Sequence, residues 1–163
     1  MAEYEHVVQP FAPVYDEHSK VLILGSLPSV KSREQGFYYG HPQNRFWKVT
    51  AAVFGEPVPE TIEEKKEMLL RNRLAVWDVI ESCDIIGSSD SSVKNAEAAD
   101  VAGLLSSSAI ERVYVNGALV GKLYDRYLFE KTGIAAVRLP STSPANARWN
   151  LEALIESWRI IGE

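Results

Sequence analysis

The chain has 163 residues and a formal net charge of −5, and 46% of its residues are hydrophobic. This balance is typical of one soluble globular domain whose core is large enough to fold without disulfides. The acidic charge argues against a protein that coats nucleic acid through a broad basic face, although it leaves room for a small basic groove.

The single cysteine, Cys83, excludes an intramolecular disulfide and predicts a buried core residue in a reducing, cytoplasmic compartment. Residues 1–19 contain acids and prolines but no apolar signal region, so we expect a lead-in segment packed on the body of the domain. Phe11, Val14 and Tyr15 are the side chains expected to pack it there. No run approaches the roughly 18 apolar residues that a membrane span requires.

A first buried strand is predicted at residues 20–25, which include the unbroken apolar string VLIL. A loop rich in Gly, Ser, Pro and Tyr follows. Regular structure is expected to resume only at Asn44, a good N-cap for a helix over residues 45–54. Long irregular connections inside a compact domain are usually functional, so this loop is expected to carry binding residues.

The string TIEE at residues 61–64 matches a capping box and predicts a helix over 62–71. A second strand is expected at 74–77, with Asp78 at its C-terminal end. The remaining elements are expected to be a polar loop at 88–92, a short helix at about 98–105, a strand at 112–115, a helix at 118–129, a strand at 134–139, a loop at 140–146, and a final helix at 147–161 with Leu151, Leu154, Ile155 and Trp158 as its buried stripe.

This alternation of strands and helices predicts a single α/β domain spanning residues 1–163. Its architecture would be a three-layer α/β/α sandwich with a mostly parallel four-stranded central sheet. Right-handed crossovers would place Asp78, Asn116 and the loops after Gly25 and Leu139 on one rim of the sheet. Ligands of open α/β sheets bind at this rim, where the strands end.

The polar residues expected at the rim lack the spacing of a zinc site, of the common phosphate-binding loops and of a nucleophile elbow. They are neutral donors and acceptors accompanied by two tyrosines, a set that suits gripping a planar heterocycle and nearby phosphates. They comprise Ser26, Ser29, Ser32, Tyr38, Tyr39, His41, Asn44, Asp78, Asn116, Ser141, Thr142, Ser143 and Asn146.

Four stretches of the chain, in order, resemble the uracil-DNA glycosylase superfamily and its hypoxanthine- (deoxyinosine-) DNA glycosylase branch, called family 6. They are GSLPS…GFYYGHPQNRFW at 25–47, WDVIESCDIIGSSDSSV at 77–93, VYVNGA at 113–118 and STSPAN at 141–146. The string HPQNRFWKV is also similar to the mismatch-specific uracil-DNA glycosylases. The resemblance covers the chain from about residue 20 to its end.

The resemblance implies a monofunctional DNA glycosylase of base excision repair. Such an enzyme flips a deaminated base, chiefly hypoxanthine, into a pocket and hydrolyses its glycosidic bond to leave an abasic site. It implies DNA as the partner, a monomer, no membrane and no metal or cofactor. The alternatives are a uracil or G:U mismatch glycosylase and, from another class, a non-catalytic nucleic-acid-binding module on the same frame.

The resemblance also assigns roles to individual residues. Asn44 would orient the attacking water, because Leu27 stands where many relatives have Asp or Asn. Ala145 takes the wedge position that is often Leu in relatives, and no His precedes Ser143-Pro144. The expected base-binding residues are Tyr39, Asp78, Asn116, His41 and Ser26, and the expected DNA-binding residues are Ser29, Ser143, Pro144, Ala145, Asn146 and Arg148.

Each assignment competes with a plainer structural role. Asn44 is also a common type of helix cap, and Asn116 before Gly117 is also a common turn. Asp78 would accept an N–H of the base or simply end its strand. His41 would touch substrate or hydrogen-bond its own loop.

Overall fold

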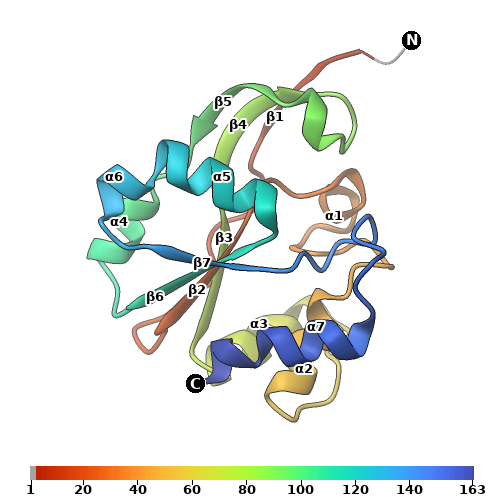
Figure 1. The fold of residues 1–163 in the computed structure, drawn as a ribbon, viewed down its shortest axis with the longest axis vertical. Helices are drawn as coiled ribbons and strands as arrows, with labels where there is room; N and C mark the ends of the chain where they lie inside the picture. The colour runs from red at the N-terminus through yellow and green to blue at the C-terminus, as the bar shows by residue number, and fades with distance from the viewer. Residues whose placement is uncertain (1–2) are drawn as a thin grey trace.

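The computed structural model describes residues 3–163, apart from the side chain of residue 90. Its centre is a parallel sheet of four strands in the order β3-β2-β6-β7 (Figure 1). The strands are β2 (Val21–Gly25), β3 (Leu74–Asp78), β6 (Arg112–Asn116) and β7 (Ala136–Leu139). In register, Gly25 lies opposite Asp78, so the ends of β2 and β3 meet at one edge. The predicted four-stranded parallel sheet is confirmed.

Helices cover both faces of this sheet because side chains along β2 alternate between two cores. Val21 and Ile23 pack in one core with α2 (Phe46–Val53), α3 (Ile62–Arg71) and α7 (Leu151–Trp158). Leu22 and Leu24 pack in the other core with α4 (Val101–Ser106) and α5 (Ala118–Tyr127), and α6 (Phe129–Thr132) continues from α5 on that side (Figure 1). The three-layer α/β/α sandwich is therefore confirmed.

A second, antiparallel sheet was not predicted. It has the order β1-β4-β5, formed by β1 (Glu5–Val8), β4 (Ile80–Ile85) and β5 (Lys94–Ala98), and stands at one end of the molecule (Figure 1). These short strands carry many polar residues, and β1 pairs with β4, a strand more than 70 residues further along the chain, which no local apolar pattern signals. Residues 5–8 of the predicted lead-in segment thus form a strand of this sheet.

Other parts of the N-terminal segment behave as expected. Val14 is buried and pairs with Val76, and Phe11 packs partly buried against the core. Tyr15 is exposed, contrary to the expectation that it packs. Cys83 is fully buried in a third, small core between the second sheet and its neighbours.

The loop after β2 was expected to be irregular, but it contains α1 (Val30–Gln35). The Ser29 hydroxyl accepts the Ser32 N–H at 3.1 Å and so starts this helix. The helix is only six residues long, which is too short for a hydrophobic periodicity to reveal it.

Several element boundaries also differ from prediction. The short helix predicted at about 98–105 begins only at Val101. Ala98 belongs to β5, where it pairs with Ile80 of β4, and Asp100 caps the helix. The last helix begins at Leu151, capped by Asn150, so residues 147–150 lie outside it. The other differences are that Leu151 is exposed, that β7 begins at 136, that the helix over 118–129 is divided into α5 and α6, and that 3-10 turns η1 (Asp90–Ser92) and η2 (Arg159–Gly162) occur.

Within the described residues, no helix has both the length and the apolar character needed to cross a bilayer.

Candidate active site

A pocket of about 870 Å³ opens at the carboxyl ends of the parallel strands. Part of its wall comes from the end of β2, the segment around α1, the ends of β3 and β6, and the loop after β7, as the crossover rule predicts. The rest comes from α5 and from the second sheet. Ten of the predicted site residues line it: Ser26, Ser29, Tyr39, His41, Asn44, Asp78, Asn116, Ser143, Pro144 and Ala145.

Asn44 is held by hydrogen bonds from two donors. Its Oδ1 accepts the Phe46 backbone N–H at 2.9 Å and the Thr142 hydroxyl at 2.9 Å. Because a backbone N–H can only donate, the atom facing Phe46 must be the amide oxygen. The Nδ2 group makes no hydrogen bond with any described residue and is the part of Asn44 left for a ligand. Asn44 was predicted to be the N-cap of α2, but the N-cap position is Arg45, and Asn44 supports the start of this helix from one residue earlier while it lines the pocket.

Thr142 joins Asn44 to Asn116. Its hydroxyl accepts Asn116 Nδ2–H at 3.0 Å, and its backbone N–H donates to Asn116 Oδ1 at 3.0 Å. Thr142 is fully buried and Asn116 is 8% exposed. These bonds occupy the Asn116 oxygen and one of its two amide hydrogens, so Asn116 fixes the 141–146 loop and has one hydrogen left to donate.

Asp78 is a buried carboxyl at the floor of the pocket. It is 3% exposed, and burial raises its pKa to about 7, although hydrogen bonds from the Gln9 side chain and the Gly25 backbone act in the opposite direction. A Cβ at Gly25 would lie only 2.6 Å from Asp78 Oδ1 and 3.0 Å from the Tyr39 hydroxyl. Glycine at position 25 is therefore what allows these two groups to converge.

Tyr39 presents an aromatic face and an unsatisfied hydroxyl. Its ring stacks on Phe46 with centroids 4.0 Å apart, which leaves the opposite ring face for the pocket. Its φ of 53° is unusual for a residue other than glycine and is held by the surrounding packing. The buried hydroxyl has no hydrogen-bond partner among the described residues. Burial first, and then the neighbouring Asp78, raises its pKa against an opposing effect of the Asn116 amide, so the hydroxyl stays neutral. Tyr38, also expected at the rim, is buried in the core, and it contributes to the pocket lining as well.

Several of the other predicted residues have clear structural roles in their own loops. His41 Nδ1 accepts the Gln43 N–H at 3.0 Å, and the Ser143 hydroxyl accepts the Ala145 N–H at 3.2 Å. Asn146 donates to the Ser141 carbonyl at 3.0 Å and does not line the pocket. Arg148 is exposed and is also outside the pocket lining. Their roles toward DNA stay predictions.

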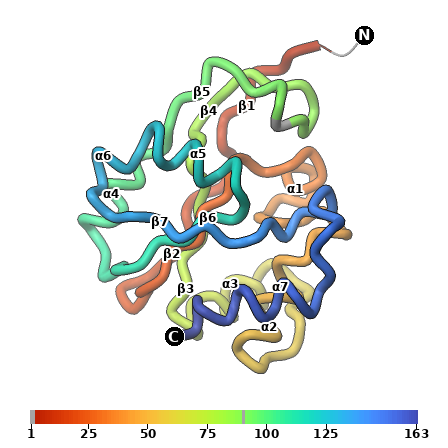
Figure 2. Tube along the Cα trace, viewed as in Figure 1, coloured from red at the N-terminus to blue at the C-terminus, as the bar shows by residue number. Residues whose placement is uncertain are grey.

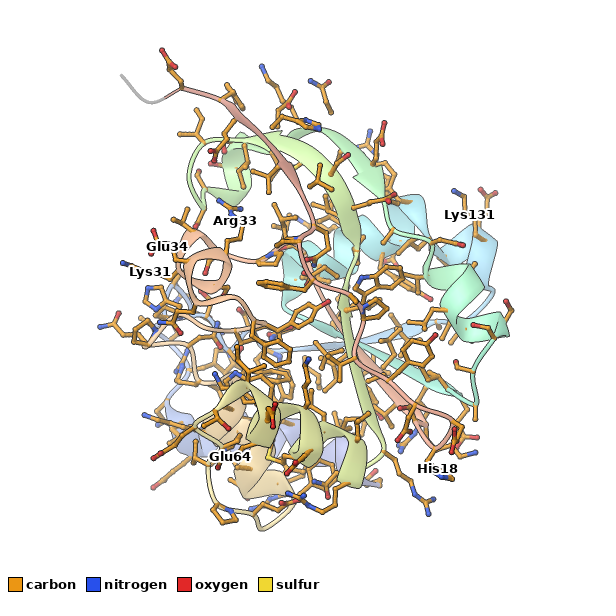
Figure 3. All side chains as sticks on the ribbon, turned by 180° about the vertical axis from the view of Figure 1, so that it is seen from behind. His18, Lys31, Arg33, Glu34, Glu64 and Lys131 are labelled. Carbon is orange, nitrogen blue, oxygen red and sulfur yellow. The ribbon has the colours of Figure 1, made fainter. Side chains whose placement is uncertain are left out.

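The charged side chains near the pocket differ in whether they form bonds with other residues. Lys31 and Glu34 project outward from α1 and form an ion pair at 3.5 Å (Figure 3). Arg33 donates to the Pro28 carbonyl at 3.1 Å. Lys94 and Arg126, which sequence reasoning did not select, also line the pocket. His18 lies at the far end of the molecule from α1, so it has no part in the site (Figure 3).

Arg45 is another residue that sequence reasoning missed. Its guanidinium donates to the carbonyls of Ser143 at 2.9 Å, of Asn146 at 3.1 Å, and of Trp149. The backbone N–H of Arg45 also donates to the Thr142 carbonyl at 3.1 Å. Figure 2 shows the blue segment after β7 running beside the orange segment that carries Arg45. Arg45 therefore fastens the second pocket loop to the first.

Replacing Arg45 by alanine should loosen the loop and destabilise the fold by about 2–3 kcal/mol, because several half-buried carbonyls lose a charged donor. Arg45→Lys should fall between alanine and wild type, since an ammonium cannot span the same carbonyls. Urea unfolding and amide hydrogen exchange over residues 141–149 measure the effect.

Arg138→Ala is the matched control for this experiment. Arg138 pairs with Asp125 at 2.9 Å in an exposed ion pair, so its loss should cost no more than about 1 kcal/mol. Equal effects of Arg45→Ala and Arg138→Ala would show that Arg45 does not organise the loop.

The described residues contain no group of three or more His, Cys, Asp or Glu side chains that could hold a metal ion. The groups that converge in the pocket are an aromatic face, a buried carboxyl with a pKa near neutrality, and an amide N–H. Such a set can stack a planar ring, read an N–H at its edge and hold a water molecule.

Comparisons with known proteins agree with this geometry. The model of the uracil DNA glycosylase superfamily matches residues 12–161. A protein named hypoxanthine DNA glycosylase from Methanosarcina acetivorans is 37% identical over 142 residues, which cover 86% of this chain and 89% of that protein. A protein of the same name from Methanosarcina barkeri is 39% identical over 90 residues, or 55% of this chain and 57% of that protein.

A solved structure shows the same fold. The solution NMR structure of a candidate uracil DNA glycosylase from Methanosarcina acetivorans has a TM-score of 0.79 and 32% sequence identity, and the match covers 95% of this chain and 98% of that chain. The order of the motifs, the parallel sheet with its rim pocket, and these matches agree. The chain belongs to the uracil DNA glycosylase superfamily.

Proposed function

We propose that this protein is a monofunctional DNA glycosylase that removes hypoxanthine from deoxyinosine in DNA and leaves an abasic site. The observation that carries the proposal is the convergence of Tyr39, Asn44 and Asp78 on one pocket at the ends of the parallel strands. Two relatives at 37% and 39% identity are named hypoxanthine DNA glycosylase, which supports this choice of base.

The flipped base would stack on the free face of Tyr39, a contact worth about 1–3 kcal/mol. Hypoxanthine carries a hydrogen on N1 and an oxygen on C6. The ionised carboxylate of Asp78 accepts that N1–H, whereas adenine has a lone pair at N1 and would be repelled. The site therefore favours the deaminated base over the base from which it arose.

Hydrolysis then needs a positioned water more than a strong base. The C1′–N bond breaks, the base takes the bonding electrons, and the sugar becomes oxocarbenium-like. Asn44 Nδ2 donates to the oxygen of the water that adds to C1′, and the departing base ends with one proton from that water. The Asn44 oxygen is already used by Phe46 and Thr142, so the amide orients the water through its N–H group.

DNA would lie across the mouth of the pocket, against the 143–145 loop and the cations Lys31, Lys94 and Arg126 that line it. Ala145 is a short wedge, which favours bases that are already poorly paired. We propose further that the protein acts as a monomer in the cytoplasm, as the single cysteine is compatible with a reducing compartment.

The test uses labelled oligonucleotides that hold one hypoxanthine, uracil or xanthine opposite each normal base. After incubation with the protein, alkali cleaves the strand at any abasic site. Cleavage at hypoxanthine above the other bases is the expected result. Cleavage mainly at uracil would assign the protein to the uracil or mismatch enzymes, and binding without cleavage of any of these substrates would favour a non-catalytic module.

A further inference from the structure

The side chain of Gln9 reaches Asp78, a residue of the pocket lining, from outside the parallel sheet. Gln9 follows β1 and precedes residue 12, where the family match begins. Its backbone N–H donates to the Glu81 carbonyl at 2.7 Å, which fixes it against β4. Its side-chain Nε2 donates to Asp78 Oδ2.

The orientation of the Gln9 amide is determined by a second bond. The Phe11 backbone N–H donates to Gln9 Oε1 at 2.7 Å. Since a backbone N–H must face an acceptor, the oxygen faces Phe11 and the NH₂ group faces Asp78. Gln9 therefore cannot turn its oxygen toward Asp78 without losing the bond to Phe11.

This bond distinguishes the two oxygens of Asp78. Oδ2 is occupied by Gln9, whereas Oδ1 lies beside Gly25 and the Tyr39 hydroxyl, both of which line the pocket. The titratable groups that face Asp78 are Tyr38 and Tyr39, and burial raises the pKa of each phenol, so both stay neutral. Among the described residues no cation pairs with Asp78. Gln9 is thus the side chain that opposes the effect of burial.

We infer that Gln9 is a positioning residue for base recognition, which favours the ionised form of Asp78 and leaves Oδ1 on the pocket side, where it accepts the ring N–H of the flipped base. The inference rests on the proposed function and deepens it. A protonated Asp78 would offer a donor from Oδ1, which suits the N1 lone pair of adenine instead of the N1–H of hypoxanthine. Gln9 therefore sets the protonation state on which the choice of base depends.

The test is the pH dependence of base release under single-turnover conditions for wild type and Gln9→Leu. The wild-type rate should rise with pH as Asp78 ionises, with a midpoint near its pKa of about 7. Loss of one hydrogen bond to a carboxylate should move the Gln9→Leu midpoint upward by about one pH unit. The variant should then be about tenfold slower than wild type well below the midpoint and about equal to it at pH 9.

Two further variants separate this effect from damage to the segment. Gln9→Ala should shift the midpoint in the same direction, and it serves if Gln9→Leu does not fold. Val8→Thr changes an exposed residue of the same segment and should leave the profile unchanged. A Gln9 variant that is slower at every pH with an unmoved midpoint would overturn the inference and leave Gln9 as a structural residue.

A second readout does not depend on catalysis. Carbon-13 NMR of the Asp78 carboxyl in the free protein follows its titration directly, and its midpoint should rise in Gln9→Leu. A shifted titration in a protein that releases no base would leave the Gln9–Asp78 coupling intact and refute only the proposed function. An unshifted titration in an active enzyme would refute the role of Gln9 alone.

Discussion

Alanine at position 44 should slow the release of hypoxanthine by about a hundredfold to a thousandfold, the usual cost of losing one preorganised polar group. The Nδ2 group of Asn44 is the part that faces no described partner, so its loss leaves the water without a donor. Binding of the damaged DNA should change little, because Tyr39 and Asp78 still hold the base. Single-turnover rates and DNA affinity, measured together, check this expectation.

Asn44→Ala also removes the acceptor for the Phe46 N–H, and this structural cost needs its own control. Thr61 has the same kind of role at the start of α3, where its hydroxyl accepts the Glu64 N–H at 3.1 Å. Thr61→Ala should therefore destabilise the protein by a similar amount, about 1 kcal/mol, with an unchanged rate. A folded Asn44→Ala protein that works within threefold of wild type would leave Asn44 as a residue that only supports the start of α2.

Asparagine at position 78 should make the protein more stable at high pH while it impairs base release. Burial raises the pKa of Asp78 from 3.8 to about 7, so the folded protein must hold a buried charge above that pH. In the unfolded chain the group ionises near pH 4. The free energy of unfolding contributed by Asp78 thus falls between about pH 4 and pH 7 and stays low above pH 7.

Asp78→Asn removes this penalty without changing the shape of the side chain. The expected gain is roughly 2–4 kcal/mol at pH 8 and close to zero at pH 4. The new amide can still accept the hydrogen bond from Gln9, but toward the pocket it presents a donor that cannot accept the N1–H of hypoxanthine. Urea unfolding of both proteins at pH 4 and pH 8 measures the difference. A variant that is less stable than wild type at pH 8 would contradict a costly buried carboxylate.

A substitution that raises stability and lowers activity marks a group retained for function rather than for folding. Asp78 fits this description because no cation among the described residues neutralises it. In contrast, Arg45 is expected to matter for folding and for the site alike, since its bonds hold the pocket loop in place.

Much of the central sheet follows from local sequence. The VLIL string of β2 is apolar at every position, which is the mark of a strand covered on both faces, and the capping box at Thr61 does start α3. The second sheet could not be predicted in the same way. The sequence KNAEA of β5 is polar and half-exposed, and it forms a strand only because β4 lies beside it.

The position of the site was predictable, but its internal bonding was not. Asp78 and Asn116 end β3 and β6, the two parallel strands that flank β2, so topology alone places them at one rim. The contacts of Arg45 reach residues 97 to 104 positions further along the chain, and Gln9 lies 69 positions before Asp78. Neither contact leaves a spacing signal in the sequence. The raised pKa of Asp78 depends on its burial and its neighbours, which only the folded structure defines.

Identification of the product tests the central claim most directly. The protein would be incubated with a DNA duplex that contains a single deoxyinosine, and the solution would be separated by chromatography before any alkali is added. The account predicts free hypoxanthine, together with an uncut strand that holds one abasic site for each base released. Intact deoxyinosine with no free base, or a strand cut with the base still attached, would contradict it.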